Sequence, residues 1–168
     1  ILAVTGSNGK TTTTTLAGEM LKEGGIPVEV CGNIGYPFSD AAPKVPENGF
    51  AVVEASSFQL ELIESFKPHI AMILNLTPDH LDRYLDFEDY KAAKYRIADN
   101  MSVTDHLILN AGDPETDINK IKTDATLDYF AAHRPLPAGV FKRGESLVGS
   151  VGGKEFKIID IARIRIPG

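Results

Sequence analysis

The sequence predicts an α/β fold in which a mostly parallel sheet with a phosphate-binding loop is flanked by helices, with a small antiparallel β portion near the C-terminus. Three observations support this prediction. Short apolar runs alternate with helical patterns over the first three quarters of the chain. A glycine-rich turn that contains a lysine joins the first apolar run to the first helical pattern. After about Thr123 the pattern changes to short β-like pieces separated by Gly, Pro and charged turns.

The strands of the parallel sheet are predicted from short runs of aliphatic and β-branched residues that are bounded by turn residues. These runs cover residues 1–5, 28–31, 50–54, 69–75 and 106–110. The later pieces, which we expect to be antiparallel, cover residues 127–131, 140–143, 146–151 and 155–160.

The helices are predicted where apolar residues recur at intervals of three or four. In the first helix this spacing turns Leu16, Met20 and Ala17 toward the sheet, and Gly24-Gly25 ends the helix. The predicted helical segments cover residues 10–23, 37–42, 57–66 and 86–101.

The composition indicates one domain. With 168 residues and 43% hydrophobic content, we expect a single compact domain over residues 1–168. A formal net charge of −6 argues against a basic surface for nucleic acid or an anionic membrane. The single cysteine, Cys31, excludes an internal disulfide framework and is typical of a reducing compartment. No apolar run approaches membrane-spanning length, so we expect a cytoplasmic monomer without a signal peptide or membrane insertion.

The turn between the first strand and the first helix has the composition of a phosphate-binding loop. Glycines let successive N–H groups face one anion, and the free N–H groups and positive dipole end of a helix add to the site. Lys10 is expected to reach terminal phosphates, Thr11 to ligate magnesium, and Thr12 to donate to a further phosphate oxygen. The candidate ATP-binding residues are Gly6, Ser7, Asn8, Gly9, Lys10, Thr11 and Thr12.

The match to the general phosphate-loop pattern is partial. Val4 stands where the outer glycine would be, so only G-x-x-G-K-T is matched. The alternative is a glycine turn that caps an ordinary helix. The strand, glycines, lysine, hydroxyls and helix occur together in the required order, which favours the phosphate loop.

Ligands of an open parallel sheet bind at the carboxyl ends of its strands, so the residues that end each run are candidates for a site. Glu54 ends one run and can hold magnesium, directly or through water. It can also be a solvated turn residue or a charge at the start of the next helix, because Ser56-Ser57 follows. Segment 75–82 combines an amide, a hydroxyl, two carboxylates and an imidazole, which favours a metal or phosphate contact for His80.

Lys94 lies close to the apolar stripe of the predicted helix 86–101, four residues after Tyr90 and three before Ile97. Its stem can lie along apolar surface with the ammonium in water. Alternatively, the amine is partly desolvated, has a lowered pKa and acts chemically. The residue pattern leaves both alternatives open.

Several of these segments, taken in order, resemble the central ATPase domain of the ATP-dependent Mur ligases. The matching segments are 5–12, 32–35, 54–60, 75–84 and 90–96. Their order and spacing are more specific than any one motif. The segment 56–60, Ser-Ser-Phe-Gln-Leu, favours the branch of the family that adds D-glutamate.

The resemblance implies a role for each matching position of the phosphate loop and the strand ends. Lys10, Thr11 and Thr12 would hold the phosphates of ATP. Thr11 and Glu54 would also bind a first magnesium ion.

The resemblance also implies roles for residues farther along the chain. Asn33 and Ser56 would face the substrate and the reacting phosphoryl group. His80 and Lys94 would serve a second magnesium ion, with the lysine carbamylated so that it becomes an anionic oxygen ligand. Lys10, His80 and Lys94 would be the catalytic residues.

The function implied by the resemblance is that of a peptidoglycan-precursor ligase, and so a role in cell-wall biogenesis, cell shape and cell division. Such an enzyme activates the carboxylate of UDP-MurNAc-L-alanine as an acyl phosphate and joins it to D-glutamate. A preceding UDP-binding domain and a following domain would lie outside this chain, so we do not expect the chain alone to be a competent ligase. The alternatives are a P-loop small-molecule kinase or NTPase and a non-catalytic nucleotide-binding module.

Overall fold

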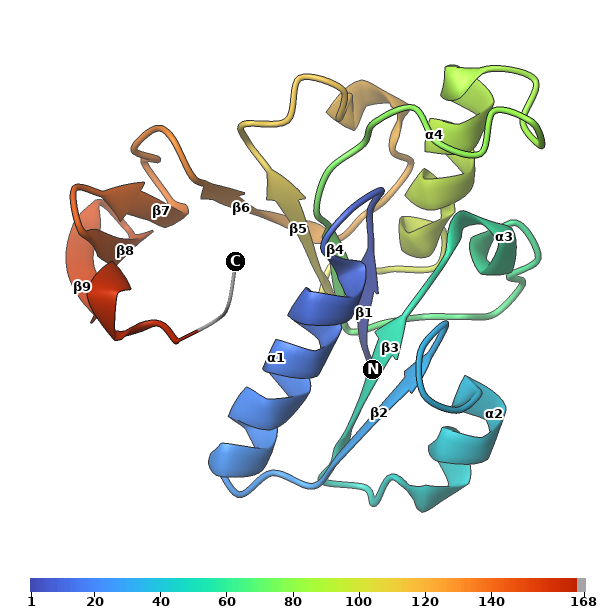
Figure 1. Cartoon of the computed structure of the whole chain (residues 1–168), viewed down its shortest axis with the longest axis horizontal. Helices are drawn as coiled ribbons and strands as arrows, with labels where there is room; N and C mark the ends of the chain where they lie inside the picture. Colours follow the sequence, from blue (N-terminus) through green and yellow to red (C-terminus); the bar gives the residue numbers. More distant parts are fainter. Residues whose placement is uncertain (166–168) are drawn as a thin grey trace.

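A nine-stranded sheet forms the centre of the computed structural model, which describes residues 1–165. The strands are β1 (Leu2–Thr5), β2 (Val28–Gly32), β3 (Phe50–Glu54), β4 (Ile70–Ile73), β5 (His106–Asn110), β6 (Thr126–Ala131), β7 (Gly139–Arg143), β8 (Ser146–Val151) and β9 (Lys154–Asp160). They lie in the order β2-β3-β1-β4-β5-β6-β7-β8-β9 (Figure 1). The helices are α1 (Lys10–Glu23), α2 (Phe38–Ala41), α3 (Ser57–Leu60) and α4 (Phe87–Tyr95).

The strands from β2 to β7 pair in parallel, and β8 and β9 add the antiparallel end of the sheet. The predicted fold class is therefore confirmed. One detail of the prediction was wrong, because the piece predicted at 127–131 is not antiparallel. As β6 it pairs in parallel with β5, and the antiparallel part begins only at the short turn between β7 and β8.

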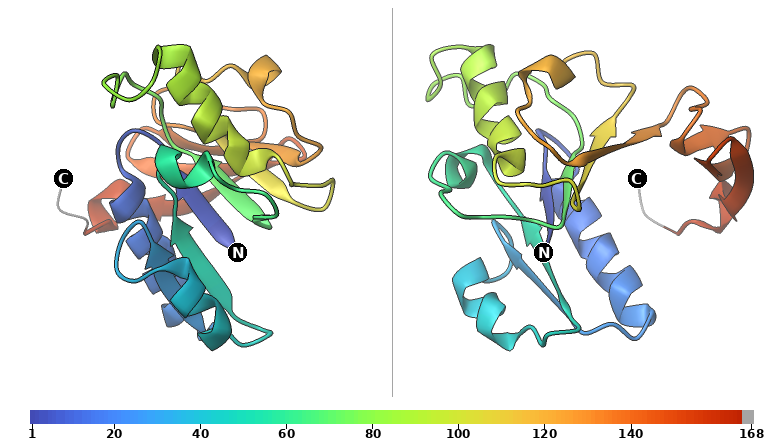
Figure 2. Two further views of the ribbon diagram at one scale, coloured as in Figure 1. Left: turned by 90° about the vertical axis from the view of Figure 1, so that its right-hand side faces the viewer. Right: turned by 180° about the vertical axis from the view of Figure 1, so that it is seen from behind.

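The two faces of the sheet are covered by different helices (Figure 2). Residues that alternate along a strand point to opposite faces. In β1, Leu2 and Val4 belong to a cluster that packs against Ala17 and Leu21 of α1. Ala3 belongs to the main core cluster on the other face, which contains Tyr95 of α4.

Helix α1 has the predicted bounds but presents a different face to the sheet. Leu16 is 39% exposed and Met20 is 66% exposed, so their predicted inward orientation was wrong, whereas Ala17 does pack on the sheet. Gly18 is buried, and a Cβ there would lie 2.2 Å from Cγ2 of Val30. The helix therefore approaches β2 closely along a stripe of small residues.

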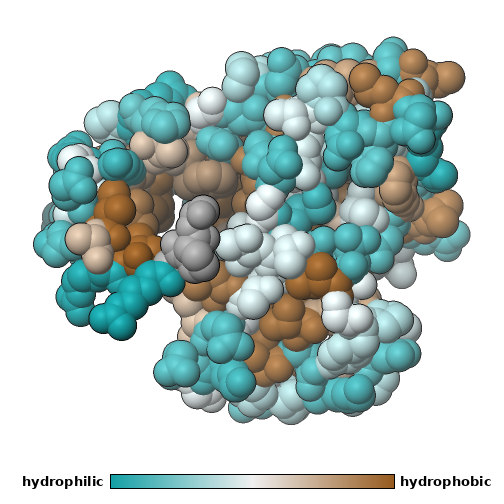
Figure 3. All heavy atoms as spheres, viewed as in Figure 1, coloured by the Kyte–Doolittle hydropathy of each residue, from teal (hydrophilic) through white to brown (hydrophobic). Residues whose placement is uncertain are grey.

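The exposed Leu16 belongs to a groove between α1 and the C-terminal strands. The groove has a volume of about 790 Å³ and a mostly apolar lining that includes Met72, Ile108, Phe130 and Phe156. Hydrophobic side chains are visible around this side of the molecule in the space-filling view (Figure 3). No helix in the described part of the chain combines the length and apolar character that crossing a bilayer requires.

Two predicted helices are shorter in the structure. Helix α3 ends at Leu60 rather than at 66. The chain that follows it is held by Arg96 and Asn100, which donate hydrogen bonds to the backbone carbonyls of residues 61, 63, 64 and 66. Helix α4 begins after the N-cap Asp86, whose side chain accepts a hydrogen bond from the Asp89 N–H at 2.9 Å. It tightens into a 3₁₀ turn over Arg96–Ala98. Periodicity therefore predicted both helices but overestimated their lengths.

Candidate functional site

The N-terminus of α1 is open toward the carboxyl edge of the sheet. Gly9 precedes the helix with a φ of 81°, and no side chain caps the first turn. The first hydrogen bond of the helix runs from the Thr13 N–H to the Gly9 carbonyl at 3.0 Å. The preceding N–H groups of the first turn have no helical partner, and Thr12 lies exposed there. Free N–H groups and the positive end of the helix dipole make this turn suitable for an anion.

The Lys10 ammonium lies over the loop that precedes α1. Its Nζ donates hydrogen bonds to the carbonyl oxygens of Gly6 and Ser7, each at 2.9 Å. The side chain is therefore folded back toward the same space that the open N-terminus of α1 faces. A phosphate oxygen there could replace the carbonyls as its partner.

Glu54 at the end of β3 is 2% exposed and connects two other predicted site residues. Its Oε2 accepts a hydrogen bond from Thr11 Oγ1 at 2.8 Å, and its Oε1 accepts one from Asn33 Nδ2 at 2.9 Å. Glu54 does not cap the following helix. Ser56 does so, in a capping box with Gln59. A turn or capping role for Glu54 is therefore not supported.

The donor set around Glu54 fits magnesium that is shared with phosphates. A carboxylate and a hydroxyl are hard oxygen ligands, and magnesium usually keeps several waters and binds through one or two protein groups plus phosphate oxygens. Within residues 1–165, no group of three or more His, Cys, Asp and Glu side chains could hold a metal alone. Thr11 and Glu54 are thus suited to a metal that arrives with a nucleotide.

Lys94 is 2% exposed, and its Nζ donates a hydrogen bond to the Gly6 carbonyl at 2.9 Å. The same atom lies 4.7 Å from the centroid of the Tyr90 ring. Burial, together with the positive charge of Lys10, lowers the pKa of the Lys94 amine to about 7, while Asp79 acts in the opposite direction. Of the two alternatives that the sequence left open, the structure therefore contains the desolvated lysine.

His80 lies in the loop after β4 in a left-handed conformation, with a φ of 52°. Its ring centroid is 4.9 Å from that of Phe58, and its Nε2 is 3.6 Å from Oδ2 of Asp79. His80, Lys94 and Lys10 line one cavity of about 270 Å³, together with Asn33 and Ser56. The structure thus brings together residues from five separate segments.

Tyr90 is a residue of this centre that the sequence reasoning did not select. It is 1% exposed, lines the same cavity, and its hydroxyl lies 3.0 Å from Ser7 Oγ. The spacing of four residues to Lys94 on one helix was the available signal, because such residues lie on the same face.

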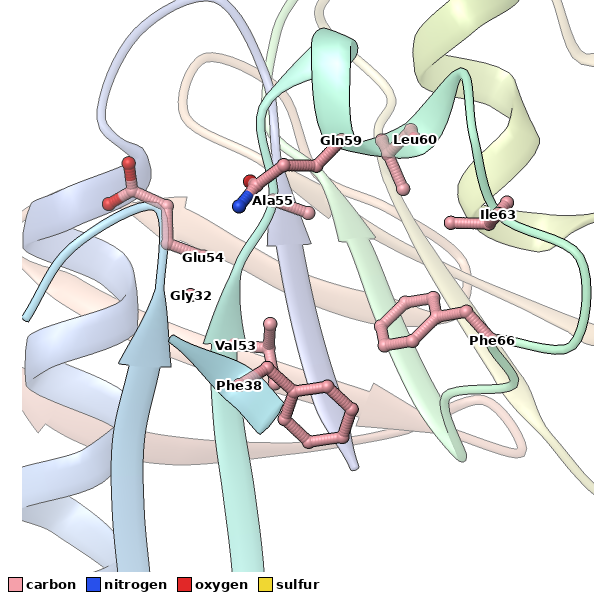
Figure 4. A pocket seen from close by; sticks show the side chains of 9 residues that line it. All are labelled: Gly32, Phe38, Val53, Glu54, Ala55, Gln59, Leu60, Ile63 and Phe66. Carbon is pink, nitrogen blue, oxygen red and sulfur yellow. The ribbon is translucent and has the colours of Figure 1, made fainter. Parts of the chain in front are cut away.

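Glu54 also belongs to the lining of a second, apolar pocket (Figure 4). It has a volume of about 200 Å³ and is lined by Phe38, Phe66 and Leu60, with the Gln59 amide near the mouth. The rings of Phe38 and Phe66 meet edge to face with centroids 6.0 Å apart. Glu54 therefore borders the apolar pocket, while Asn33, to which it is hydrogen bonded, lines the polar cavity.

Comparisons with known proteins identify the family of the chain. The family described as the Mur ligase middle domain matches residues 4–159. UDP-N-acetylmuramoylalanine–D-glutamate ligase of Thermoanaerobacter sp. (strain X514) is 48% identical over 168 residues, which is 100% of this chain and 37% of that protein. The corresponding enzyme of Solibacter usitatus is 43% identical over 147 residues, covering 88% of this chain and 33% of that protein.

Solved structures share the fold. A UDP-N-acetylmuramoyl-L-alanyl-D-glutamate–2,6-diaminopimelate ligase matches with a TM-score of 0.68 at 20% identity, covering 94% of this chain and 38% of that one. MurF from Acinetobacter baumannii matches with a TM-score of 0.68 at 20% identity, covering 94% and 37%. The chain thus spans little more than a third of the curated relatives that it matches. On the family match and these identities, the chain belongs to the Mur ligase family.

Proposed function

We propose that this chain is the central, nucleotide-binding domain of a ligase that joins D-glutamate to UDP-MurNAc-L-alanine at the expense of ATP. One observation carries the proposal most strongly: an open helix N-terminus with Lys10, the Thr11–Glu54 pair and buried Lys94 meet at one edge of the sheet. The D-glutamate ligases to which the chain is 40–48% identical supply the proposed substrates. A cytoplasmic monomer remains part of the proposal, and the free, buried Cys31 is compatible with that compartment.

In the proposed reaction, a carboxylate oxygen of the alanyl group attacks the γ-phosphorus of ATP. The bond from that phosphorus to the β–γ bridging oxygen breaks, ADP leaves, and an acyl phosphate forms. The amine of D-glutamate then attacks the acyl carbon, an amide bond forms, and inorganic phosphate and a proton are released. Catalysis of phosphoryl transfer is mostly positioning and charge stabilisation, which agrees with a site rich in N–H groups and ammonium groups.

The residues of this chain have separate tasks in that scheme. The first turn of α1 and Lys10 would bind the phosphates, and Asn33 and Ser56 would face the substrate. Thr11 and Glu54 would hold a first magnesium ion, which when bound neutralises charge on the phosphates. His80 and Lys94 would hold a second one, shared with the substrate.

Lys94 would serve that second position as a carbamate. The lone pair of its neutral amine attacks the carbon of CO₂, an N–C bond forms, and one amine proton is released to solvent. The product is an anion with two oxygen donors, which magnesium prefers over nitrogen. The lowered pKa of Lys94 supports this step, because only the neutral amine reacts.

A chimera tests the proposed function. The segment of the Thermoanaerobacter ligase that matches this chain would be replaced by residues 1–168, and the product of ATP, UDP-MurNAc-L-alanine and D-glutamate would be analysed by chromatography. We expect amide formation in the chimera and at least a hundredfold less, to order of magnitude, when Lys10→Ala is added. A phosphorylated product that needs no amine acceptor would instead favour a kinase. Nucleotide binding by a folded chimera without turnover would favour a non-catalytic module.

A further inference from the structure

The segment that follows β4 lies against residues 6–8 of the phosphate loop. We propose that Asn75 in this segment is a positioning residue, which holds residues 6–8 in the nucleotide-binding conformation and fixes them relative to His80. The proposal rests on the nucleotide site proposed above and adds to it a residue with no assigned role.

Asn75 contacts the loop through both its side chain and its backbone. Its Oδ1 accepts a hydrogen bond from the Asn8 N–H at 2.8 Å, and its Nδ2 donates one to the Asn8 carbonyl at 3.0 Å. Its own carbonyl accepts a hydrogen bond from the Ser7 N–H at 2.9 Å. The amide side chain thus pairs with the loop backbone as a neighbouring strand would.

Gly6 permits this close approach. Its φ is 149°, and a Cβ at this position would lie 3.1 Å from Cβ of Leu74 and 3.3 Å from the carbonyl oxygen of Asn75. A side chain at position 6 would therefore push the loop away from the segment. The phosphate loop and residues 74–75 are packed against each other, in addition to being hydrogen bonded.

The segment that carries Asn75 is itself held from the side of β5. The Leu74 carbonyl accepts a hydrogen bond from Asn110 Nδ2 at 3.0 Å, and the Leu76 N–H donates one to Asp113 Oδ2 at 3.0 Å. Leu76 is fully buried. Asn75 is therefore held in place by residues at the end of β5, and through its own hydrogen bonds it holds the phosphate loop in place.

Ser7 extends the contact toward the cavity that contains His80. Its Oγ donates a hydrogen bond to the Thr77 carbonyl at 3.0 Å and accepts one from the Thr77 N–H at 2.9 Å. The same oxygen meets the Tyr90 hydroxyl at 3.0 Å. Three residues after Thr77 the chain reaches His80, so the contacts of Asn75 and Ser7 set the distance between the phosphate loop and that side chain.

The contact also determines which donors face an anion. The N–H groups of Ser7 and Asn8 are both bonded to Asn75, so they are not directed into the site. The N–H groups of the first turn of α1, beside Lys10, have no helical partner and can face an anion. Without Asn75, the N–H groups of Ser7 and Asn8 would no longer be held away from the site. The nucleotide itself would then have to order the loop, which lowers its affinity.

The test compares the affinity of two asparagine variants of this chain for Mg·ADP by calorimetry. Asn75→Ala removes both side-chain bonds to the loop. The matched control, Asn100→Ala, removes two bonds of similar length, from Nδ2 to the carbonyls of Glu64 and Phe66, near the amino end of β4. We expect Asn75→Ala to weaken binding by about tenfold or more and Asn100→Ala by about twofold at most, although both lose two hydrogen bonds.

Hydrogen exchange gives a second readout that needs no variant to fold. In the free wild-type chain the Asn8 amide should exchange slowly, although the residue is exposed, because it is bonded to Asn75. Exchange at the rate of an unprotected amide, or equal Mg·ADP affinities of folded Asn75→Ala and wild type, would overturn the positioning role and leave the nucleotide site standing. If the wild-type chain bound no Mg·ADP, the nucleotide site itself would be wrong, whereas slow exchange at Asn8 would still support the contact with Asn75.

Discussion

At the scale of single residues, α4 offers a direct comparison between two buried lysines. Lys91 is 5% exposed and lies beside Glu88 and Glu115, whose hydrogen bonds and charges raise the pKa of its ammonium. Lys94 is 2% exposed, is hydrogen bonded to no carboxylate within residues 1–165, and has its pKa lowered to about 7. Burial is the main cause of the lowered pKa of Lys94, whereas at Lys91 the hydrogen bonds to Glu88 and Glu115 outweigh it. Lys94 is therefore the lysine suited to react as a neutral amine.

A carbamate on Lys94 is therefore expected when the chain is given labelled bicarbonate and magnesium. Its carbon NMR signal should grow as the pH rises through about 7, because the neutral fraction of an amine with this pKa grows there. The signal should disappear in Lys94→Ala and persist in Lys91→Ala. A signal that is absent above that pH, or that survives in Lys94→Ala, would assign the lysine to packing alone.

The proximity of several of these site residues could be predicted from the sequence. The carboxyl ends of parallel strands meet at one edge, so Lys10, Thr11 and Glu54 could be expected to be neighbours. The state of Lys94 could not be decided, because its surroundings include the Gly6 carbonyl, 88 residues away. No local pattern reports a contact over that separation.

At the scale of elements, α1 shows how packing overrides a hydrophobic pattern. The apolar Leu16 and Met20 suggested the buried face, but the small residue Gly18 lies against Val30 instead. A small side chain lets the helix approach the sheet closely, and this brings its N-terminus to the site. Hydrophobicity alone does not report such an approach, because glycine carries no apolar side chain.

Gly18→Ala should therefore destabilise the chain, although the helix propensity of alanine is more favourable than that of glycine by about 1 kcal/mol. The added Cβ would lie 2.2 Å from Cγ2 of Val30, and this β-branched side chain has little freedom to move away. We expect a net loss of about 1–3 kcal/mol in the free energy of unfolding, measured in urea. The double variant Gly18→Ala with Val30→Ala should recover part of it. Stabilisation by the single variant would contradict the close approach.

In segment 57–66 the structure differs from the prediction in the length of the helix. Its apolar spacing predicted one helix, but only Ser57–Leu60 is helical. After Leu60 the chain is held by Arg96 and Asn100, which donate hydrogen bonds to the carbonyls of residues 61, 63, 64 and 66. Element type was predictable here from local spacing, and element length was not, because the chain after Leu60 is held by residues more than thirty positions away.

At the scale of the whole molecule, the proposed site lies at one edge of the sheet, and the chain spans 37% of the length of its Thermoanaerobacter relative. Substrate-binding groups in the remainder of such a ligase would supply the effective concentration of the two reactants. The isolated chain should therefore form no measurable amide from UDP-MurNAc-L-alanine and D-glutamate, with the chimera as the positive control in the same chromatographic assay. Amide formed by the isolated chain at the rate of the chimera would contradict this division of roles.

The most direct test of the nucleotide site is a calorimetric titration of Mg·ATP into the chain and two lysine variants. Lys10 lies over the phosphate loop, and Lys22 lies in the last turn of the same helix. We expect the wild type to bind Mg·ATP weakly. Lys10→Ala should lower this affinity by about tenfold or more, because a charge-assisted hydrogen bond is removed, and Lys22→Ala should leave it unchanged. Equal affinities of wild type and Lys10→Ala, or no binding of Mg·ATP by the wild type, would contradict it.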